Sequence, residues 1–487
     1  MSGVRNHERL KVIPVKKVGV RGFIGVIMKT GPQLGCLPDS ETAWVSNNSH
    51  VTKEEIILAN QECLFPAVFH YFREPLVLTK AKNQYVWDAD GNQYLDFFGG
   101  ILTVSVGHCN EKVNRAVHAQ VDQLQHVSTV FPTEPQAALA RKISAIAPGN
   151  GWKSFFTNSG TEANEMAILA ARFFTGSTDI IALRHSYHGR SSLAMGVTGQ
   201  ANWKLGPPVQ AGITFAHNAY CYRCPFGLTY PDCEVRCAQD VGELIRTTTT
   251  GQIAGMIAEP IQGVGGFITP PKEYFKIVSK IVREYGGVFI SDEVQTGWGR
   301  TGHRWWGIDQ WGVTPDIVTS AKGLANGFPI GLTAARPEVA DSVKKLTIST
   351  FGGGPIQAAA AKAVIDLIEE ENLAGNAATA GAHLRAGLED LKDKYPLIGD
   401  VRGMGLMQAI ELVQDRGSKA PATAETLQLM EAARENRVLI GRGGLNGNVI
   451  RISPPLNVSR TDVDSFIRTL DASLAQVSAP ALSGTQG

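Results

Sequence analysis

The sequence lacks several features that would assign it to a common class of protein. It has no apolar run of about 18 residues, so no segment is a candidate transmembrane helix. Its formal net charge is only +1, which gives no reason to expect nucleic acid or an anionic membrane as a partner. No GxxxxGK(S/T) phosphate loop is present. The 487 residues contain no internal repeat and are enough for two domains with a substantial core.

Cysteine is scarce, at seven residues, but four of the seven form a cluster. Cys221, Cys224, Cys233 and Cys237 follow the pattern C-x2-C-x8-C-x3-C, and the spacing within each pair suits a tetrahedral metal site. A structural zinc ion is therefore one interpretation of the insertion at residues 220–238. Free thiols in a loop or lid are the plainer alternative, because proline and glycine interrupt this insertion. Disulfides would need an oxidising compartment, for which the sequence gives little support.

Acidic residues are nearly absent from the first 30 residues, where Glu8 stands alone among several lysines and arginines. A basic, acid-poor leader resembles an organellar transit peptide, although serine is scarce in it. A secretory signal would need a small-residue cleavage site after the apolar patch at residues 23–28, and none is convincing. A flexible extension over residues 1–50, or a true start at Met28, is the plainer interpretation. We expect a cytoplasmic protein, with organellar targeting by this leader as the alternative.

Five short motifs each follow an apolar segment that is predicted to be a β-strand. The motifs are residues 159–162 after the strand at 154–157, 187–189 after 180–183, 259–260 after 253–257, 292–295 after 288–290, and 320–323 after 316–319. Alternating strands and helices between residues 111 and 355 predict a mostly parallel sheet with helices on both faces. Ligands of such sheets bind beyond the carboxyl ends of the strands. The five motifs would bring an anion cradle, an aromatic ring, two acids and a lysine there, which fits pyridoxal 5′-phosphate.

Lys322 and Asp292 are the candidate catalytic residues. A lysine amine that can lose its proton forms a Schiff base with the cofactor aldehyde and later moves a proton between carbon atoms. Ala321 and Gly323 are small enough to let a bulky ring approach. Asp292 would keep the pyridine nitrogen protonated, and the protonated ring is the electron sink of this chemistry. The competing interpretations are a solvated surface lysine and an aspartate that caps a helix.

Ser159, Gly160 and Thr161 form the candidate phosphate cradle. Ser159 and Glu162 have the spacing of a capping box, so a helix should begin here with free N–H groups at its positive end. The motif alone is weak, because most capping boxes bind nothing.

The remaining strand-end residues are candidates for contact with the cofactor ring. Tyr187 could stack on one face of the ring and Val294 on the other. The Gln295 amide could form a hydrogen bond with the ring hydroxyl, and Glu259 is the second acid at this edge. Simple core packing is the alternative for an aromatic residue or a valine at a strand end.

Together the five motifs resemble the class III aminotransferases of the fold-type I pyridoxal-phosphate enzymes. The resemblance extends from about residue 65 to about residue 474. It implies a large domain with a mostly parallel sheet, and a smaller α+β domain built from the N- and C-terminal segments. It also implies Lys322 as the Schiff-base lysine and Asp292 as the partner of the pyridine nitrogen. The other implied cofactor contacts are Ser159, Gly160, Thr161, Tyr187, Glu259, Val294 and Gln295.

Two residues outside the five motifs also match the family. Thr350, in the segment 349–353, matches a threonine that reaches the phosphate of the neighbouring subunit. That match implies a homodimer with shared active sites, and a tetramer is a further alternative. Arg451, in the segment 451–456, matches the arginine that grips the substrate carboxylate, a task that suits a planar bidentate donor. A surface ion pair is the alternative for Arg451.

One departure from the family pattern bears on the substrates. Many relatives that use glutamate or 2-oxoglutarate carry a glutamate at the position of Val264, where it pairs with the carboxylate arginine. The run 259–266 is instead similar to the alanine–glyoxylate aminotransferase 2 branch. The resemblance implies a ping-pong transfer of an amino group from alanine or a β- or ω-amino donor to a small 2-oxo acid such as glyoxylate or pyruvate. The alternatives are racemisation or epimerisation, oxidative decarboxylation, and a scaffold protein without activity.

The predicted domain organisation has five parts. They are an extension at residues 1–50, a first segment of the small domain at 51–110, a large cofactor-binding domain at 111–355, the rest of the small domain at 356–480, and a flexible tail at 481–487. Within them we expect helices at 52–62 and 356–371, a hairpin at 76–97, and short strands at 407–412 and 449–452. Residues 98–101 are a candidate substrate wall, with a turn in the core as the alternative.

Overall fold

A computed structural model describes residues 51–149, 151–206 and 211–478. The chain divides into two units, residues 1–68 and residues 69–487, which are described separately. The described part of the first unit contains helix α1 (Lys53–Cys63), as its sequence predicts. A capping box starts this helix, because Thr52 Oγ1 accepts from the Glu55 N–H and Glu55 Oε2 accepts from the Thr52 N–H. The interpretations of residues 1–50 lie outside the described residues.

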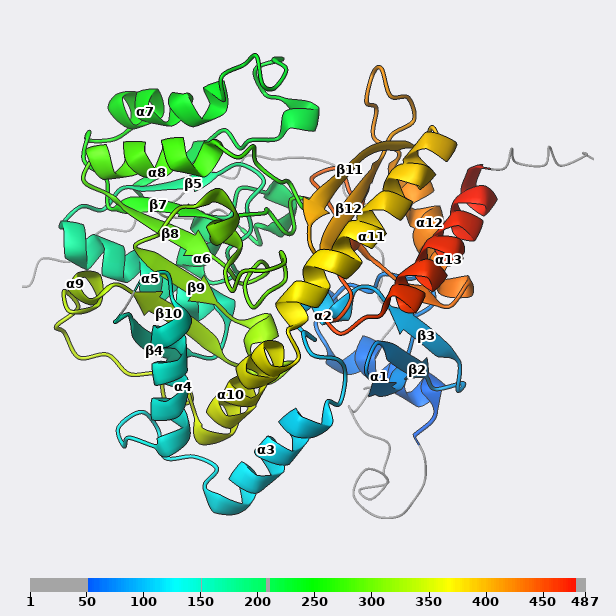
Figure 1. The fold of residues 1–487 in the computed structure, drawn as a ribbon, viewed down its shortest axis with the longest axis horizontal. Coiled ribbons are helices and arrows are strands. Elements are labelled where there is room, and N and C mark those ends of the chain that lie inside the picture. Colours follow the sequence, from blue (N-terminus) through cyan, green and yellow to red (C-terminus); the bar gives the residue numbers. More distant parts are fainter. Residues whose placement is uncertain (1–50, 150, 207–210, 479–487) are drawn as a thin grey trace, which may run out of the picture. The chain divides into compact units, whose positions relative to one another are not determined.

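The second unit is built on a seven-stranded sheet in the order β4-β10-β9-β8-β7-β5-β6 (Figure 1). Its strands are β4 (Lys153–Thr157), β5 (Ile180–Leu183), β6 (Ile213–Ala216), β7 (Gly255–Ala258), β8 (Val288–Asp292), β9 (Ile317–Ser320) and β10 (Gly331–Ala335). All of these except β10 run in one direction, and β10 is antiparallel to both of its neighbours. The mostly parallel α/β sheet predicted from the sequence is confirmed.

Helices cover both faces of this sheet because its strands are apolar on both faces. One buried cluster joins alternate strand residues, such as Ile180, Ile257 and Ile290, to helix α5 (Gly160–Thr175). The intervening residues belong to a second cluster with helices α7 (Arg236–Thr248) and α8 (Tyr274–Glu284). The carboxyl ends of the parallel strands are therefore the edge of the sheet at which loops can form a site.

The C-terminal part contains a four-stranded antiparallel sheet in the order β11-β12-β15-β14. Its strands are β11 (Ile398–Met404), β12 (Met407–Leu412), β14 (Gly441–Gly443) and β15 (Val449–Ile452). The helices of this part are α10 (Pro355–Glu370), α11 (Leu373–Lys394), α12 (Thr423–Glu435) and α13 (Arg460–Ser478). Helix α11 packs on β11, β12 and α13 (Figure 1). The helix expected at 356–371 and both short strands are present.

A third sheet joins the two ends of this unit. Strands β1 (Leu78–Lys82), β2 (Tyr85–Asp88) and β3 (Gln93–Asp96) form an antiparallel meander, and β13 (Val438–Leu439) adds to β3 in parallel. The predicted hairpin is therefore a three-stranded arrangement with an additional turn between β1 and β2. This pairing brings residues near position 95 beside residues near position 438, which places N- and C-terminal segments in one layer.

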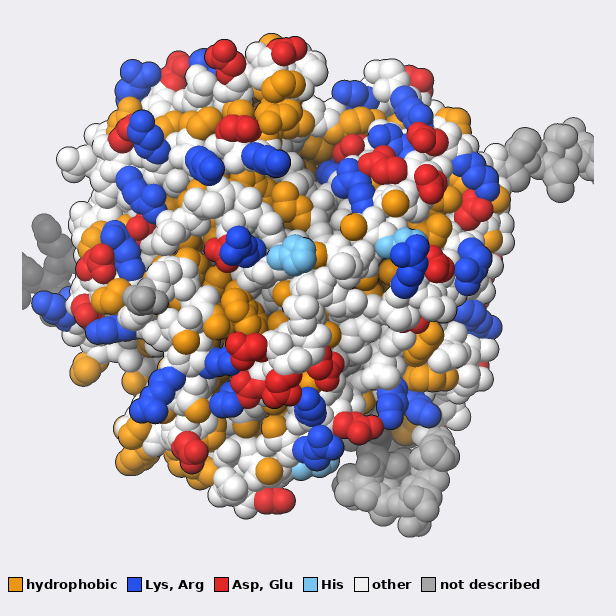
Figure 2. Space-filling view, in the orientation of Figure 1, with side chains coloured by type: hydrophobic (Ala, Val, Ile, Leu, Met, Phe, Trp, Pro, Cys, Tyr) orange, Lys and Arg blue, Asp and Glu red, His pale blue; other side chains and the backbone are white. Residues whose placement is uncertain are grey.

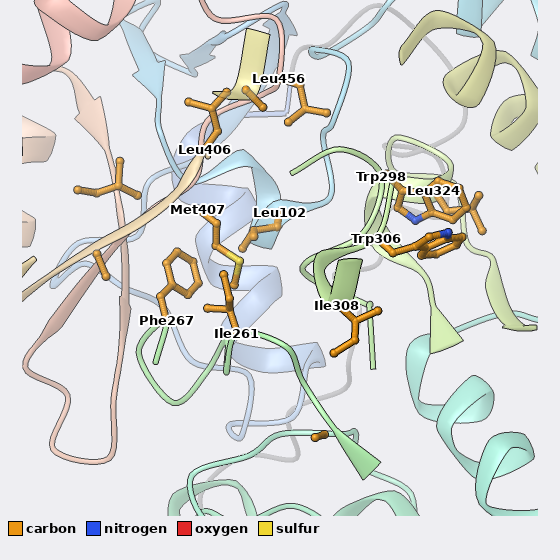
Figure 3. Close-up of a cluster of buried hydrophobic side chains, with 14 of the residues drawn as sticks. Leu102, Ile261, Phe267, Trp298, Trp306, Ile308, Leu324, Leu406, Met407 and Leu456 are labelled. Atoms are coloured by element: carbon orange, nitrogen blue, oxygen red, sulfur yellow. The ribbon is translucent and has the colours of Figure 1, made fainter. Parts of the chain in front are cut away.

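The core continues from the large sheet into the C-terminal strands. Figure 3 shows Ile261 and Phe267, from the loop after β7, together with Met407 of β12, and all three are fully buried. Trp298 and Trp306 pack against each other in the same core, with ring centroids 4.8 Å apart. Loops that carry strand-end residues are thus anchored by close-packed side chains.

The surface agrees with the charge balance of the sequence. On the face shown in Figure 2, basic and acidic side chains are interspersed. Among the described residues, none of the helices is long and apolar enough to cross a membrane.

Candidate active site

The residues predicted at the strand ends gather around one cavity of about 180 Å³. Its lining includes Gly160, Thr161, Tyr187, Glu259, Asp292, Val294, Gln295 and Lys322. They come from the loops after β4, β5, β7, β8 and β9, which confirms that these strand ends converge. Ser159 lies beside the cavity at the N-cap of α5, where its hydroxyl accepts from the Glu162 N–H at 3.3 Å.

Close packing around the start of α5 favours glycine at two positions. A Cβ at Gly160 would lie 3.0 Å from a methyl group of Val294, and a Cβ at Gly189 would lie 2.4 Å from Thr161 Oγ1. The free N–H groups of this helix N-terminus and the Thr161 hydroxyl face a cradle with the positive end of a helix dipole. This arrangement suits a phosphate group.

Lys322 is half-buried at the end of β9, in a backbone conformation with φ of 44° that favours glycine. Loss of hydration around its amine is the main cause that lowers its pKa to about 8; the positive charge of Arg451 acts in the same direction, and the charges of Asp292 and Glu259 oppose it. Strained backbone conformations cluster at functional sites. The amine can therefore exist in its neutral, nucleophilic form near physiological pH.

Asp292 is buried at the end of β8 and is surrounded by hydrogen-bond donors. Its Oδ2 atom lies 2.7 Å from His188 Nδ1 and 2.8 Å from Asn164 Nδ2. Asn164 is itself oriented by Thr319 Oγ1, which donates to its Oδ1 at 2.6 Å. A buried carboxylate with this many donors keeps a defined orientation.

Glu259 is fully buried at the end of β7. It accepts from the N–H of Tyr187 at 2.9 Å and from the N–H of Gly263 at 2.8 Å. Burial raises its pKa to about 7, an effect that the charge of His188 opposes and that of Asp292 reinforces. Glu259 therefore links the loops after β5 and β7 behind the cavity.

The Gln295 side chain ends in a polar atom without a partner. Its Oε1 is buried and has no hydrogen-bond partner among the described residues. A Cβ at Gly263 would lie 2.3 to 2.5 Å from the Gln295 amide, so glycine is needed for this approach. The unpartnered Gln295 Oε1, the cradle at the start of α5 and Lys322 together fit pyridoxal 5′-phosphate.

Arg451 lies on β15 and is buried without an acidic partner within the described part of the chain. Its Nε donates to the Arg442 carbonyl at 3.2 Å, its Nη2 approaches the Tyr71 hydroxyl at 3.5 Å, and its buried Nη1 has no partner there. The guanidinium lies 5.9 Å from the Phe98 ring centroid and 5.7 Å from that of Phe267. A surface ion pair, the alternative considered for Arg451, does not describe this arrangement.

Glycines in β14 make room for this arginine. A Cβ at Gly443 would lie 2.9 Å from Arg451 Cδ, and a Cβ at Gly441 would lie 2.5 Å from the Phe98 ring. The segment containing Phe98 turns sharply, because Gly100 and Ile101 both have positive φ, at 57° and 65°. Residues 98–101, the candidate substrate wall, therefore form a left-handed turn. The Phe98 ring at the start of this turn contacts Arg451.

Thr350 does not line the cavity and is exposed. It lies in a segment whose neighbours Leu346, Ile348 and Phe351 are exposed by 104%, 64% and 59%. The same segment is adjacent to the phosphate cradle, because Asn158 Nδ2 donates to Ser349 Oγ at 3.4 Å. An exposed apolar surface of this kind is typical of a protein interface.

The zinc interpretation of the cysteine cluster is not supported. Cys221, Cys224, Cys233 and Cys237 line one small cavity as free thiols, and no group of described side chains could hold a metal ion. Burial raises the pKa of Cys221 to about 11 and that of Cys237 to about 12. The insertion is also partly helical, since Cys237 lies in α7.

Four residues of the site were not predicted from the sequence: His188, Asn164, Tyr71 and Phe267. His188 directly follows Tyr187, and Asn164 lies one helical turn after Gly160, so adjacency and helical periodicity could have identified both. Tyr71 and Phe267 approach Arg451 from distant irregular segments, for which the sequence has no local signal.

Known proteins share this fold. An (S)-enantioselective omega-transaminase from Thermomicrobium roseum superposes with a TM-score of 0.82 and 33% identity, covering 88% of this chain and 100% of the other. An amine transaminase from an uncultivated Pseudomonas species, solved in its PLP-bound form, has a TM-score of 0.80 and 31% identity over 85% of this chain and 99% of its own. The fold and site therefore define a PLP-dependent transaminase.

Sequence comparison identifies the family. Residues 70–474 match the model of the class-III aminotransferases, and the chain belongs to this family. The Arabidopsis thaliana protein named alanine–glyoxylate aminotransferase 2 homolog 2, mitochondrial, is 44% identical over 87% of each chain. Human alanine–glyoxylate aminotransferase 2, mitochondrial, is 38% identical over 86% of each chain. A leucine/methionine racemase from Thermococcus litoralis is 37% identical over 87% of this chain and 96% of its own. The protein is thus an enzyme, a class III aminotransferase that uses pyridoxal 5′-phosphate.

Proposed function

We propose that the enzyme moves an amino group from alanine, or from a β- or ω-amino donor, to a small 2-oxo acid such as glyoxylate or pyruvate. The observation that carries this proposal is the buried Arg451 guanidinium, which has an unpartnered Nη1 and Val264 where many relatives have an acid. An unpaired buried cation is costly, so the site favours a ligand carboxylate. Two relatives named as alanine–glyoxylate aminotransferases support the same substrates.

The strand-end residues would hold the cofactor. Ser159, Gly160 and Thr161 would bind its phosphate at the start of α5. Tyr187 and Val294, which both line the cavity, would pack on opposite faces of its ring, as the resemblance to the family implies. The unpartnered amide of Gln295 would bond the ring hydroxyl. Glu259 would hold the loop that carries Tyr187 in place through the hydrogen bond at 2.9 Å.

Two residues would carry the proton chemistry. Bound pyridoxal 5′-phosphate supplies an aldehyde for the amino group and a protonated pyridine that withdraws electrons from the substrate carbon. Asp292, oriented by His188 and Asn164, would hold the proton on the pyridine nitrogen. Lys322, whose pKa is lowered to about 8, would remove and return a proton at the substrate carbon. Donor and acceptor would use the site in turn, which gives ping-pong kinetics.

The first test measures pyruvate formed from alanine without any acceptor. The proposal predicts about one pyruvate per active site, followed by continuous turnover when glyoxylate is added. Absence of pyruvate, with active β- or ω-amino donors, would reject alanine as the donor and retain the reaction class.

Racemisation is the second candidate, because one relative is named as a leucine/methionine racemase. A racemase would form the D-enantiomer from L-leucine or L-methionine without stoichiometric oxo acid. Chiral chromatography of the same reaction mixtures distinguishes the two. Oxidative decarboxylation would release carbon dioxide in addition to the oxo compound.

A homodimer would complete the active site. Thr350 is exposed beside the phosphate cradle, within an apolar segment that includes Leu346 and Ile348. In the proposed assembly this threonine reaches the phosphate bound by the neighbouring subunit.

The relatives named as mitochondrial support an organellar destination over a cytoplasmic one, with the basic leader as the candidate targeting segment. Import of a fusion that carries residues 1–50 into isolated mitochondria would test this destination.

A further inference from the structure

Tyr71 contacts the carboxylate-binding arginine from outside the strand-end motifs. Its hydroxyl lies 3.5 Å from Arg451 Nη2, at the long end of hydrogen-bond range. Its ring packs edge-on against Phe98, with centroids 5.4 Å apart, and Phe98 in turn lies below the Arg451 guanidinium. Tyr71 therefore contacts this arginine both directly and through Phe98.

The segment that carries Tyr71 is held in place by helix α12. The Arg73 N–H donates to Glu431 Oε1 at 2.8 Å, and the Arg434 guanidinium stacks 5.2 Å from the Phe72 ring centroid. Phe69 packs edge-on against Tyr71 at 5.5 Å. The Tyr71 hydroxyl is thus presented to Arg451 by an anchored segment.

An aromatic row connects this contact to the cavity. The row consists of Tyr187, Trp203, Phe69, Tyr71 and Phe98, with successive ring centroids 5.4, 6.0, 5.5 and 5.4 Å apart. Its members carry no formal charge, and Tyr71 is the one whose polar atom reaches Arg451. The rings themselves offer no cation to a second carboxylate on a substrate, and an unpaired carboxylate is costly to bury.

We propose that Tyr71 is a positioning residue that holds Arg451 in a neutral environment and thereby selects monocarboxylic substrates over dicarboxylic ones. An acidic partner would form an ion pair with the arginine that a substrate carboxylate has to displace. A phenol hydroxyl orients Nη2 but leaves the positive charge uncompensated, so the carboxylate of a small amino or oxo acid binds directly. This inference rests on the proposed role of Arg451 in carboxylate binding.

The test compares an amino donor that has a carboxylate with one that lacks it. In Tyr71→Phe holoenzyme we expect the KM for alanine to rise about five- to tenfold, the loss typical of one hydrogen bond to a charged group, with kcat within about twofold. The KM for isopropylamine should change by less than about twofold, because this donor has no carboxylate. Tyr85→Phe is the matched control, since Tyr85 is also half-buried and also loses a hydrogen bond, to Asp462 at 3.1 Å.

A double-mutant cycle tests whether Tyr71 acts through the arginine. Arg451→Met should raise the KM for alanine more than Tyr71→Phe does, and Tyr71→Phe should add nothing in the Arg451→Met background. Equal changes with alanine and isopropylamine would show a general structural role and overturn the inference. An effect of Arg451→Met without any effect of Tyr71→Phe would also overturn it. No effect of Arg451→Met would instead refute the proposed role of Arg451 itself.

Binding of unreactive acids gives a readout that does not depend on turnover. By calorimetry, wild-type enzyme should bind propionate more tightly than glutarate. Tyr71→Phe should weaken propionate binding by the same factor as it raises the KM for alanine. Val264→Glu, which places an acid next to this region, should weaken propionate binding about tenfold or more by pairing with Arg451. Tighter binding of glutarate than of propionate by wild-type enzyme would contradict the neutral environment.

Discussion

His188 Nδ1 lies 2.7 Å from Asp292 Oδ2, and both side chains are buried at the carboxyl edge of the large sheet. Asn164 donates to the same oxygen, and the Val294 N–H donates to Oδ1 at 3.1 Å. Donors therefore engage both carboxylate oxygens. They come from the helix after β4 and from the loops after β5 and β8, so three separate segments fix the orientation of one acid.

Asp292→Asn should lower kcat for alanine–glyoxylate exchange on the order of 100-fold or more. The amide cannot stabilise a proton on the pyridine nitrogen, and electrostatic stabilisation of this kind is worth several kcal/mol. The melting temperature should change little, because the amide oxygen can still accept from Asn164 or His188. Asp390→Asn is the control, because Asp390 is exposed on α11. Retention of more than about half of wild-type kcat would contradict the role of Asp292.

Lys322→Ala should abolish measurable transamination while leaving the protein folded. A positioned general base contributes on the order of 100- to 10,000-fold, and the variant also loses the covalent attachment of the cofactor. Steady-state rates and circular dichroism would be measured together. Lys280→Ala serves as the matched variant, because that side chain is 78% exposed on α8. Full turnover by Lys322→Ala would show that another residue moves the proton.

The capture of pyridoxal 5′-phosphate by the cofactor-free protein should depend on pH. Burial lowers the pKa of Lys322 to about 8, so the reactive neutral amine is the minor form below that pH and the major form above it. The capture rate, followed by absorbance, should rise with pH and level off above about 8. In Arg451→Met the midpoint should move to higher pH, because a positive charge that lowers the lysine pKa is lost. A midpoint near 10.5 in the wild type would contradict the effect of burial.

Gly263→Ala should weaken cofactor binding about tenfold without unfolding the protein. The new Cβ would overlap the Gln295 amide at 2.3 to 2.5 Å, and this flexible side chain can move away at the cost of its contact with the cofactor. Equilibrium dialysis would measure the affinity. Gly242→Ala in α7 meets only Ile281, at 3.7 Å, and should instead stabilise the protein by about 0.5–1 kcal/mol. Equal cofactor affinities for the two variants would argue against the assignment of Gln295.

Mixing two inactive variants should restore activity if the active sites are shared. Thr350→Glu would place a negative charge beside the phosphate of the neighbouring subunit, and Lys322→Ala removes the lysine. A hybrid dimer contains one site with Lys322 intact and an unmodified Thr350 supplied across the interface. Activity should recover to roughly a quarter of wild type after subunit exchange, because half of the dimers are hybrids with one working site each. Verified hybrids without activity would refute the sharing of Thr350.

The strand-end residues could be predicted because topology, more than local sequence, determines where they meet. Parallel strands converge at their carboxyl ends, so Gly160, Asp292 and Lys322 had to approach one another once their strands were recognised. The reversed direction of β10 had no such signal, since its sequence is as apolar as that of its neighbours. The contact between Tyr71 and Arg451 joins an irregular segment to β15, and only tertiary packing defines it.

For the cysteine cluster, the zinc interpretation drawn from the sequence is not supported by the structure. Its spacing suits a metal site, yet spacing carries no information about burial. The four cysteines line one small cavity as free thiols, and no group of described side chains could hold a metal ion. Spacing alone therefore does not determine whether four thiols form a metal site.

During synthesis of the chain, strand β4, which precedes the phosphate cradle, is made long before the strand that pairs with it. Among the described strands, β4 is hydrogen-bonded to β10 alone, although β5 to β9 all emerge from the ribosome between them. A nascent chain that has not reached residue 335 therefore carries β4 as an open edge next to a half-built sheet. Open edges pair readily with other chains. We therefore expect a chain that ends before residue 331 to aggregate more readily than the full-length chain, because β4 lacks its partner strand.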